Sequence, residues 1–393
     1  MTVSRDMPVQ GGLEQIPSGS TYRVESLTGI RAVAALLVMV THAAFTTGKY
    51  PEGYFGSFWS RTEIGVPIFF VLSGFLLFRP WVQASRKGRP GPSLLRYTRH
   101  RIRRIMPAYV VTVLAAYAVY HFRAVEPNPG HTVTGLFRNL TLTQIYTDNY
   151  VYSYLHQGLT QMWSLAVEVG FYIALPFLAY VLLVLLCRRQ WRPYRLLAGL
   201  AVAAAISPAW LILVHTVEGL PDGARLWPPA YLMWFVGGMT LTVLQALNVR
   251  AYGFAVIPLA VICYAIASTP VAGEPTTTPR ELAQALVKVV FYAVIAALAV
   301  APLALGDRGW YAWVLGTRPM VWLGEISYEM FLIHMVLIEI AMVDVLHWRI
   351  WTGSMWGLFA VTVVMTVPLA WLLHYLTWDL PARRRARREE SRA

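Results

Sequence analysis

Residues 27–45 read LTGIRAVAALLVMVTHAAF, an apolar run of membrane-spanning length that is interrupted by Arg31 and His42. Ionisable side chains inside a bilayer are costly, and they rarely persist there without a function. Eleven residues along an α-helix return to within about 20° of the starting face and rise about 16 Å. We therefore expect a membrane-spanning helix that points Arg31 and His42 into one protein interior.

Apolar stretches of similar length recur along the chain. Hydrophobic residues make up 57% of the 393 residues and charged residues 13%, which is far from the balance of a soluble domain. Backbone polar groups inside a bilayer must be paired within the segment, so such stretches predict helices. The sequence therefore predicts an all-α, polytopic membrane protein with about ten transmembrane helices. Their expected positions are residues 27–45, 62–78, 104–122, 159–185, 196–215, 228–247, 251–268, 285–303, 325–345 and 354–377.

These helices form one predicted membrane domain, residues 27–380, between an N-terminal segment, residues 1–26, and a basic tail, residues 381–393. The N-terminal segment contains no apolar stretch, so we expect no cleavable signal peptide. The two cysteines, Cys187 and Cys263, provide neither a disulfide framework nor a zinc motif, and we expect no metal site.

The basic residues indicate how the chain is oriented. The net charge of +13 could suggest a nucleic-acid partner, but the arginines gather on alternate connections, around residues 79–104, 188–195 and 383–388. The connections at 123–158 and 216–227 are poor in basic residues. The positive-inside rule then places both termini in the cytoplasm, as an even number of helices requires. We expect a multi-pass protein of the plasma membrane, surrounded by lipid and without a nucleic-acid partner.

The connection at 123–158 is the longest one predicted outside the membrane. It is rich in Asn, Thr, Tyr and His. It is either an ordered lid or acceptor surface, or a polar loop that only joins two helices.

The fourth predicted helix carries polar residues on one face. The three-to-four spacing of that face aligns Gln161, Ser164, Glu168 and Tyr172. Helical rise places Glu168 about 12 Å below the outer surface, near the expected depth of His42. Such a pair suits general base chemistry, in which the carboxylate orients the imidazole. The alternative is a buried ion pair that only fixes helix packing.

The second predicted helix, TEIGVPIFFVLSGFLLF, contains small residues and one acid. Gly65, Pro67, Ser73 and Gly74 interrupt its apolar run, and small residues of this kind favour close helix packing. Glu63 begins the helix, where the helix dipole favours an anion.

The stretch RYTRHRIRRIMP stands at the expected cytoplasmic mouth of the third predicted helix, with Arg101 and Arg104 three residues apart on one face. Arginine side chains suit phosphate oxygens because the guanidinium group donates two parallel hydrogen bonds. The alternative is a set of topogenic charges that contact anionic lipid headgroups.

The ninth predicted helix carries several polar residues within LGEISYEMFLIHMVLIE, namely Glu325, Ser327, Glu329, His334 and Glu339. So many ionisable groups in one span must face partners or water. The spacing places Glu325 and Glu329 on one face, and Ser327 and His334 on another. Glu329 and Arg31 are expected at a similar depth in the membrane, and on this ground alone we predict that Glu329 neutralises Arg31.

Five motifs together resemble the acyltransferase 3 family of bacterial integral membrane acyltransferases. They are LTGIRAVAALLVMVTH, GVPIFFVLSGFLLF, RIRRIMP, QMWSLAVEVGFYIALP and ISYEMFLIH, and they occur in the family's order over roughly residues 22–378. The resemblance implies a ten-helix enzyme that transfers an acyl group, commonly acetyl from acetyl-CoA, to a hydroxyl group. It implies Arg31 and His42 as the essential pair and Arg101 with Arg104 as the arginine pair. Position 28, often an acid in the family, is Thr28 here.

From residues and resemblance together we predict an O-acetyltransferase that uses acetyl-CoA as a substrate and holds no permanent cofactor. Its expected acceptor is an envelope glycan or glycolipid on the outer side, such as a trehalose mycolate, or alternatively a secondary metabolite such as a macrolide. His42 is the expected general base or, alternatively, the carrier of the acyl group, with Glu168 and Arg31 as further catalytic residues. Arg101, Arg104 and Arg103 are expected to bind the CoA phosphates.

Further candidates for the site are Ser164, Trp163 and Tyr172 on the acceptor side, with Glu329, Glu63, Ser327 and His334. Two other classes of protein fit the same polar residues. A transporter or flippase of a glycolipid or sugar precursor also needs charges within its helices. A structural or partner-binding membrane protein would use them for helix assembly.

Overall fold

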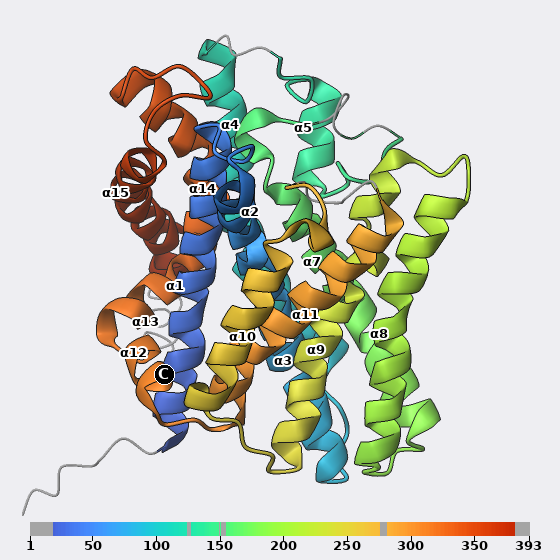
Figure 1. Cartoon of the computed structure of the whole chain (residues 1–393). Coiled ribbons are helices and arrows are strands. Elements are labelled where there is room, and N and C mark those ends of the chain that lie inside the picture. The colour runs from blue at the N-terminus through green and yellow to red at the C-terminus, as the bar shows by residue number, and fades with distance from the viewer. Residues whose placement is uncertain (1–18, 124–126, 149, 151–154, 276–280, 382–393) are drawn as a thin grey trace, which may run out of the picture.

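The computed structural model describes residues 19–123, 127–148, 150, 155–275 and 281–381, and all regular structure within these ranges is helical. The longer helices run side by side as a bundle (Figure 1). They are α1 (Gly19–Thr46), α3 (Gly65–Arg86), α4 (Leu94–Phe122), α7 (Met162–Ala179), α8 (Pro193–Thr216), α9 (Pro228–Ala246), α10 (Gly253–Ala267), α11 (Leu282–Leu305), α14 (Ser327–Ile340) and α15 (Met355–His374).

Shorter helices join or extend these elements. The short α-helices are α2 (Gly53–Ser60), α5 (Val133–Leu140), α12 (Trp310–Leu315) and α13 (Arg318–Glu325). A 3₁₀ turn, Arg61–Ile64, leads into α3, and π-helical turns extend α7, α14 and α15 over Tyr180–Leu186, Ala341–Val345 and Tyr375–Asp379. All ten apolar stretches predicted from the sequence are therefore helical.

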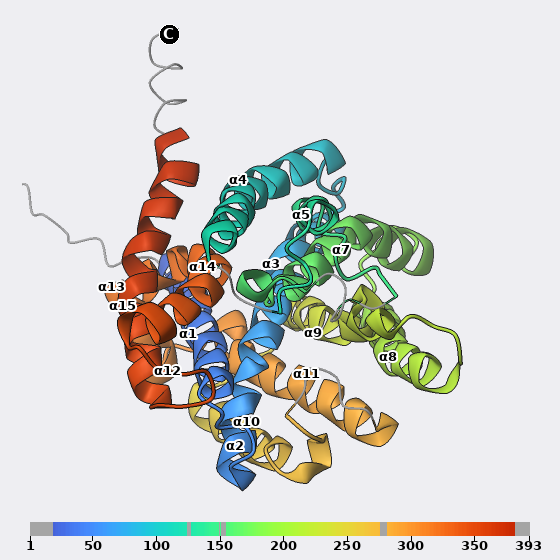
Figure 2. The same ribbon diagram turned by 90° about the horizontal axis from the view of Figure 1, so that it is seen from above.

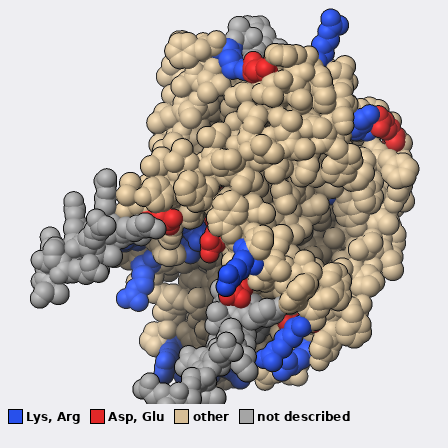
Figure 3. Space-filling view, turned by 90° about the vertical axis from the view of Figure 1, so that its left-hand side faces the viewer, with Lys and Arg blue, Asp and Glu red and all other residues tan. Residues whose placement is uncertain are grey.

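Seven helices are long and apolar enough to cross a membrane, or eight if the bent pair α13–α14 counts as one span, among the residues described. One face of the molecule shows a broad band almost free of charged side chains, with Lys, Arg, Asp and Glu above and below it (Figure 3). The protein is thus a multi-pass membrane protein. The count of ten spans and the cytoplasmic side of the termini stay predictions. The predicted tail from residue 382 and the N-terminal segment up to residue 18 lie outside the described residues.

Several helices extend beyond their predicted bounds, and two differences from the prediction affect the site. The third helix begins at Leu94, ten residues before the expected start at Arg104. Arginine is a good helix former, and its long side chain reaches water from a helix end, so this basic stretch continues the helix. The ninth span is broken, because α13 and α14 meet at an angle of 68°. At the break, the Ser327 hydroxyl donates to the backbone oxygen of Gly324 at 2.7 Å.

Helix α3 lies near the centre of the bundle, between α1 and α14 on one side and α7 and α9 on the other (Figure 2). Glycines allow its backbone to approach its neighbours closely. A Cβ atom on Gly74 would lie 1.9 Å from the backbone oxygen of Phe235, and one on Gly238 would lie 1.9 Å from that of Val71. A Cβ on Gly65 would lie 2.2 Å from the oxygen of Ala34 in α1. Gly65 and Gly74 therefore serve close helix packing, as predicted.

The predicted outer connection at 123–158 is structured in its described part. It contains α5, which packs on α4 through hydrogen bonds. The Tyr109 hydroxyl donates to the backbone oxygen of Asn139, and the Tyr117 hydroxyl donates to that of Gly130 at 2.6 Å. This connection is therefore an ordered surface at one end of the bundle, and its predicted contact with an acceptor stays a prediction.

Candidate active site

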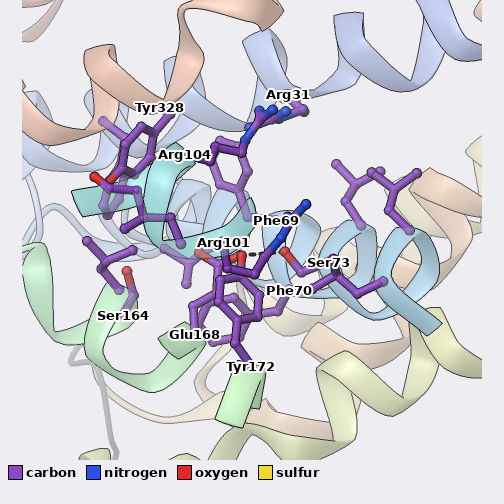
Figure 4. A pocket seen from close by; sticks show the side chains of 17 residues that line it. Arg31, Phe69, Phe70, Ser73, Arg101, Arg104, Ser164, Glu168, Tyr172 and Tyr328 are labelled. Carbon is purple, nitrogen blue, oxygen red and sulfur yellow. Dashed lines mark hydrogen bonds between the residues drawn. The ribbon is translucent and has the colours of Figure 1, made fainter. Parts of the chain in front are cut away.

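A chamber of about 220 Å³ lies where α1, α3, α4, α7 and α14 meet. Its polar lining comes from all five helices, because each places between one and three of these side chains on its inner face (Figure 4). The polar residues are Arg31, Ser73, Arg101, Arg104, Ser164, Glu168, Tyr172 and Tyr328. The remaining wall is apolar and includes Phe69, Phe70 and Phe331. The structure thus gathers six of the predicted site residues at one chamber, namely Arg31, Arg101, Arg104, Ser164, Glu168 and Tyr172.

A larger cavity, the vestibule, adjoins this chamber. It has a volume of about 460 Å³ and is lined by Thr28, Arg31, Arg103, Arg104, Pro107, Trp322, Glu325, Ile326, Tyr328, Glu329, Trp371, His374, Thr377, Trp378 and Asp379. The start of α1 and the described end of the chain therefore lie at the same cavity. Arg31, Arg104 and Tyr328 line both spaces. These three side chains form the boundary between vestibule and chamber.

The chamber has a cationic side. Arg101 and Arg104 are one turn apart on α4, and Arg31 faces them from α1 (Figure 4). In the described part of the chain, the guanidinium of Arg31 has no hydrogen bond and no ion pair within 4 Å. Guanidinium groups that face a cavity suit an anionic ligand, above all phosphate.

Glu168 is held by two hydroxyl groups. The Ser73 hydroxyl of α3 donates to its carboxylate, and so does that of Tyr172, at 2.5 Å from the same oxygen. Tyr172 lies one turn farther along α7, as the predicted face required. The expected contact between Glu168 and His42 is not present, because His42 is not among the residues that line the chamber. The physical reason is that α3 lies beside α7 and supplies the nearer partner, Ser73.

His42 lies instead against α14. Its ring contacts that of His334, with centroids 5.2 Å apart. His334 is fully buried, whereas His42 is partly exposed. Phe331 lines the chamber, and its ring lies 5.9 Å from that of His334. His42 is therefore linked to the chamber through Phe331 and His334 rather than by facing it directly.

The expected pair of Arg31 and Glu329 is also wrong as a direct contact. Both residues line the vestibule, but Glu329 accepts a hydrogen bond from Nδ1 of His374 at 3.0 Å. The break before Ser327 places Glu325 on α13 and Glu329 on α14, so they do not share one helical face as predicted. The sequence analysis did not identify His374, because a lone histidine at the end of an apolar stretch is only a weak indication of a functional site.

A second, smaller cavity of about 40 Å³ lies beside the chamber and shares Val66 with it. Glu63 and Trp163 line it, together with aromatic residues of α9 and α11. Glu63 pairs with the amine of Lys288 at 2.6 Å and accepts a hydrogen bond from the Tyr292 hydroxyl at 2.8 Å. The sequence analysis missed Lys288, although a lone lysine inside the apolar stretch at 285–303 was a usable signal.

Two further candidates have structural roles in the described chain. Ser327 is buried, and its hydroxyl donates to the backbone oxygen of Gly324 at the helix break. Glu339, near the outer connection, accepts from the Tyr120 hydroxyl and pairs with Arg123 at 3.4 Å. Ser164 lines the chamber, but its hydroxyl donates to the backbone oxygen of Gln161 at 3.1 Å.

Known proteins are similar to this chain over most of its length. The family described as "Acyltransferase domain" matches residues 24–375. The chain is 29% identical to the acyltransferase MdmB of Streptomyces mycarofaciens over 333 residues, which are 81% of this chain and 79% of the relative. It is 25% identical to the peptidoglycan O-acetyltransferase OatA of Listeria monocytogenes over 333 residues, 81% of this chain and 50% of the relative.

A third relative is the O-acetyltransferase OatA of Staphylococcus aureus, 22% identical over 340 residues, which are 78% of this chain and 49% of the relative. The chain thus spans about half the length of the OatA proteins that it matches. No solved structure matches it.

Proposed function

This chain belongs to the acyltransferase domain family, and from that premise we propose that it transfers an acetyl group from cytoplasmic acetyl-CoA to a hydroxyl group of an envelope glycan or glycolipid. Membrane-bound O-acyl transfer is the class of activity that the family and its relatives support. One observation carries the proposal to this protein: a vestibule and a chamber in series, with arginine side chains at their boundary.

The arginines suit the phosphates of acetyl-CoA. Arg103 and Arg104 line the vestibule, and Arg31, Arg101 and Arg104 line the chamber. We assign the phosphates to the vestibule and the pantetheine arm to the chamber, whose wall is largely apolar. The basic ends of the helices and the described end of the chain lie at the expected cytoplasmic side of the bundle. Acetyl-CoA would arrive from this side.

The reaction requires a base, and His42 is the residue that we propose for it. His42 takes the proton of the acceptor hydroxyl while its oxygen attacks the thioester carbonyl carbon. The new C–O bond forms, the C–S bond breaks, and the proton passes from His42 to the leaving thiolate. The products are an ester and free CoA. For the thioester to reach His42, the side chain of Phe331 must move, since it lies between the chamber and His334.

We propose the acceptor only by its chemical class. One relative is named for O-acetylation of peptidoglycan, which supports an envelope glycan, and a glycolipid such as a trehalose mycolate has the same kind of hydroxyl group. A secondary metabolite is the alternative acceptor. Labelled lipid, glycan and metabolite fractions from wild-type and deletion strains, compared for acetyl content, distinguish the three.

The donor site is tested with two matched double variants. Arg101→Gln with Arg104→Gln should raise the KM for acetyl-CoA by at least ten-fold, because each guanidinium contributes about 1.5–3 kcal/mol to a phosphate. Arg96→Gln with Arg99→Gln is the control, since both of these arginines are exposed, have the same spacing on α4 and line neither cavity. Equal KM values for the two variants would refute the assignment.

The reaction itself is tested in proteoliposomes. His42→Ala should abolish acetyl transfer from labelled acetyl-CoA and leave acetyl-CoA binding intact. Retained transfer would rule out His42 as the base. Movement of a sugar or glycolipid across the membrane without acyl-CoA consumption would instead indicate a transporter.

A further inference from the structure

His334 on α14 has one ring nitrogen with a partner and one without. Nδ1 lies 2.8 Å from the backbone oxygen of Phe331. Nε2 is buried and has no hydrogen-bond partner in the described chain. A buried polar atom left unpaired costs about 1–3 kcal/mol, and such atoms call for an explanation in terms of strain, function or a missing partner.

The hydrogen bond to Phe331 fixes which nitrogen of His334 carries the proton. A carbonyl oxygen only accepts, so Nδ1 must donate, and neutral His334 then has a lone pair on Nε2. The carbonyl is held in place by a second donor, since the side-chain amide of Gln161 lies 3.2 Å from it and 2.8 Å from the oxygen of Leu332. The start of α7 therefore locks the tautomer of a histidine on α14.

The ring of His334 lies against that of His42. The two centroids are 5.2 Å apart and the planes are tilted by 45°. Neither nitrogen of His42 has a hydrogen bond to another described residue. A modest rotation of the partly exposed His42 ring brings an N–H group toward the acceptor nitrogen of His334. The reverse arrangement, in which His334 donates, is excluded while Nδ1 carries its proton.

We propose that His334 is a positioning residue for His42. It accepts the N–H of His42 through Nε2, which leaves the opposite nitrogen of His42 unprotonated and directed at the acceptor hydroxyl. The same hydrogen bond persists when His42 has taken the proton, so the charged ring stays in place until the thiolate leaves. This inference rests on the proposed function of His42. It assigns to His334 the orienting task that the sequence suggested for Glu168.

Two isosteric variants separate the two nitrogen atoms of His334. An asparagine places its amide nitrogen near Nδ1 and keeps the bond to Phe331, but it has no acceptor in the place of Nε2. A glutamine reaches the place of Nε2 with an amide oxygen that still accepts. We expect His334→Asn to lower kcat about 100-fold, at the low end of the effect of a disabled general base, with the KM for acetyl-CoA changed less than three-fold. His334→Gln should retain at least a tenth of the wild-type kcat.

A leucine variant, which lacks both nitrogens, serves as a second test and should lose kcat as the asparagine variant does. Melting temperature and acetyl-CoA binding establish which variants are folded. Wild-type kcat in folded His334→Asn or His334→Leu overturns the inference. So does a folded His334→Gln variant that is inactive, and so does a rise in KM at constant kcat.

The failure of this inference is distinguishable from failure of the proposed function. An active His42→Ala variant removes His42 as the base, and the role of His334 is removed with it. An inactive His42→Ala variant beside a fully active His334→Asn variant leaves the base in place and removes only the positioning role.

Discussion

At the scale of single residues, the carboxylate of Glu168 is defined by the two hydroxyl groups that donate to it. Ser73 comes from α3 and Tyr172 from α7. This carboxylate lines the same chamber as three arginines. Its position therefore determines how strongly its negative charge offsets their positive charges. The two donors belong to different helices and hold Glu168 in one orientation.

Tyr172→Phe removes one of these donors without removing the ring. A hydrogen bond to a charged group contributes about 1.5–3 kcal/mol, and we expect kcat/KM to fall by about ten-fold or more. The same substitution combined with Glu168→Gln should cost less than the two separate effects together, because both act on one interaction. Tyr311→Phe is the control, since its hydroxyl donates to the backbone of Ala299 outside the chamber. Additive effects of Tyr172 and Glu168 would contradict the coupling.

The sequence predicted much of the chamber at this scale. Arg31 and Glu168 stood out because charge inside an apolar helix is costly. Arg101 and Arg104 stood out as a pair of guanidinium groups suited to phosphate, and all four residues line the chamber. Their partners were harder to predict. Spacing along a helix states which face a residue shares, but it does not state which neighbouring helix that face meets. Glu168 therefore pairs with Ser73 rather than His42.

At the scale of helices, the contact of α3 with α9 depends on glycine. Gly238→Ala should lower the melting temperature markedly, because the new Cβ would lie 1.9 Å from a backbone oxygen that belongs to a packed helix. Overpacking of this kind costs about 1–3 kcal/mol. Gly237→Ala is a matched control on the same helix, since its Cβ would have no neighbour closer than 3.7 Å. Similar melting temperatures for the two variants in detergent would refute the close contact.

The ion pair of Glu63 with Lys288 joins α11 to the turn before α3. Lys288→Met leaves the carboxylate of Glu63 without its cation in a buried setting, and such a loss costs about 3–5 kcal/mol. We expect a lower melting temperature for Lys288→Met and a substantial recovery when Glu63→Gln is added, because the double variant has no unpaired charge. A double variant less stable than the single one would contradict this explanation.

The helix break before Ser327 shows a limit of sequence analysis at this scale. Residues 325–345 have the composition of one continuous span, and Ile326 has no feature that would end a helix. Nevertheless, α13 turns away from α14 by 68°. A Cβ on Gly324 would lie 2.0 Å from the backbone oxygen of Thr28, so close packing of α13 on α1 sets the direction. Such tertiary packing overrides local propensity.

At the scale of the whole molecule, the connection at 123–158 carries a cluster of histidines, which includes His131 and His156. Burial and the neighbouring His131 imidazole lower the pKa of His156 to about 3. An unfolded histidine titrates near pH 6.5, so the unfolded segment binds more protons between about pH 6.5 and 3. The stability contributed by neutral His156 is complete above pH 6.5 and is lost as the pH falls toward 3.

We therefore expect the connection to loosen at pH 5, with a loss of up to about 2 kcal/mol. Hydrogen exchange at the amides of Gly130 and Gln157, corrected for the intrinsic rate, measures this opening, since both amides bond within the connection. His156→Phe keeps a ring beside Tyr117 and cannot be protonated, so its exchange should be much less sensitive to pH. An equal response in this variant would assign the effect to another group.

The architecture as a whole was more predictable than its details. Apolar length alone identified all ten helical stretches, because a bilayer leaves a buried backbone few other choices. Apolar length did not predict the start of the third helix, because the first turns of that helix are basic. The vestibule was not predicted either, because Trp322 lies far in sequence from Trp371 and Trp378 and meets them only in the folded chain.

The glycine contact between α3 and α9 also restricts how the enzyme can move. Where two main chains touch without intervening side chains, one cannot slide or tilt without carrying the other. The two helices therefore move as one rigid unit, and α3 lines the chamber. Any movement that admits the proposed pantetheine arm must then occur where these two helices meet α1, α4 or α14. Disulfide cross-links from α3 to those helices, rather than from α3 to α9, should arrest turnover.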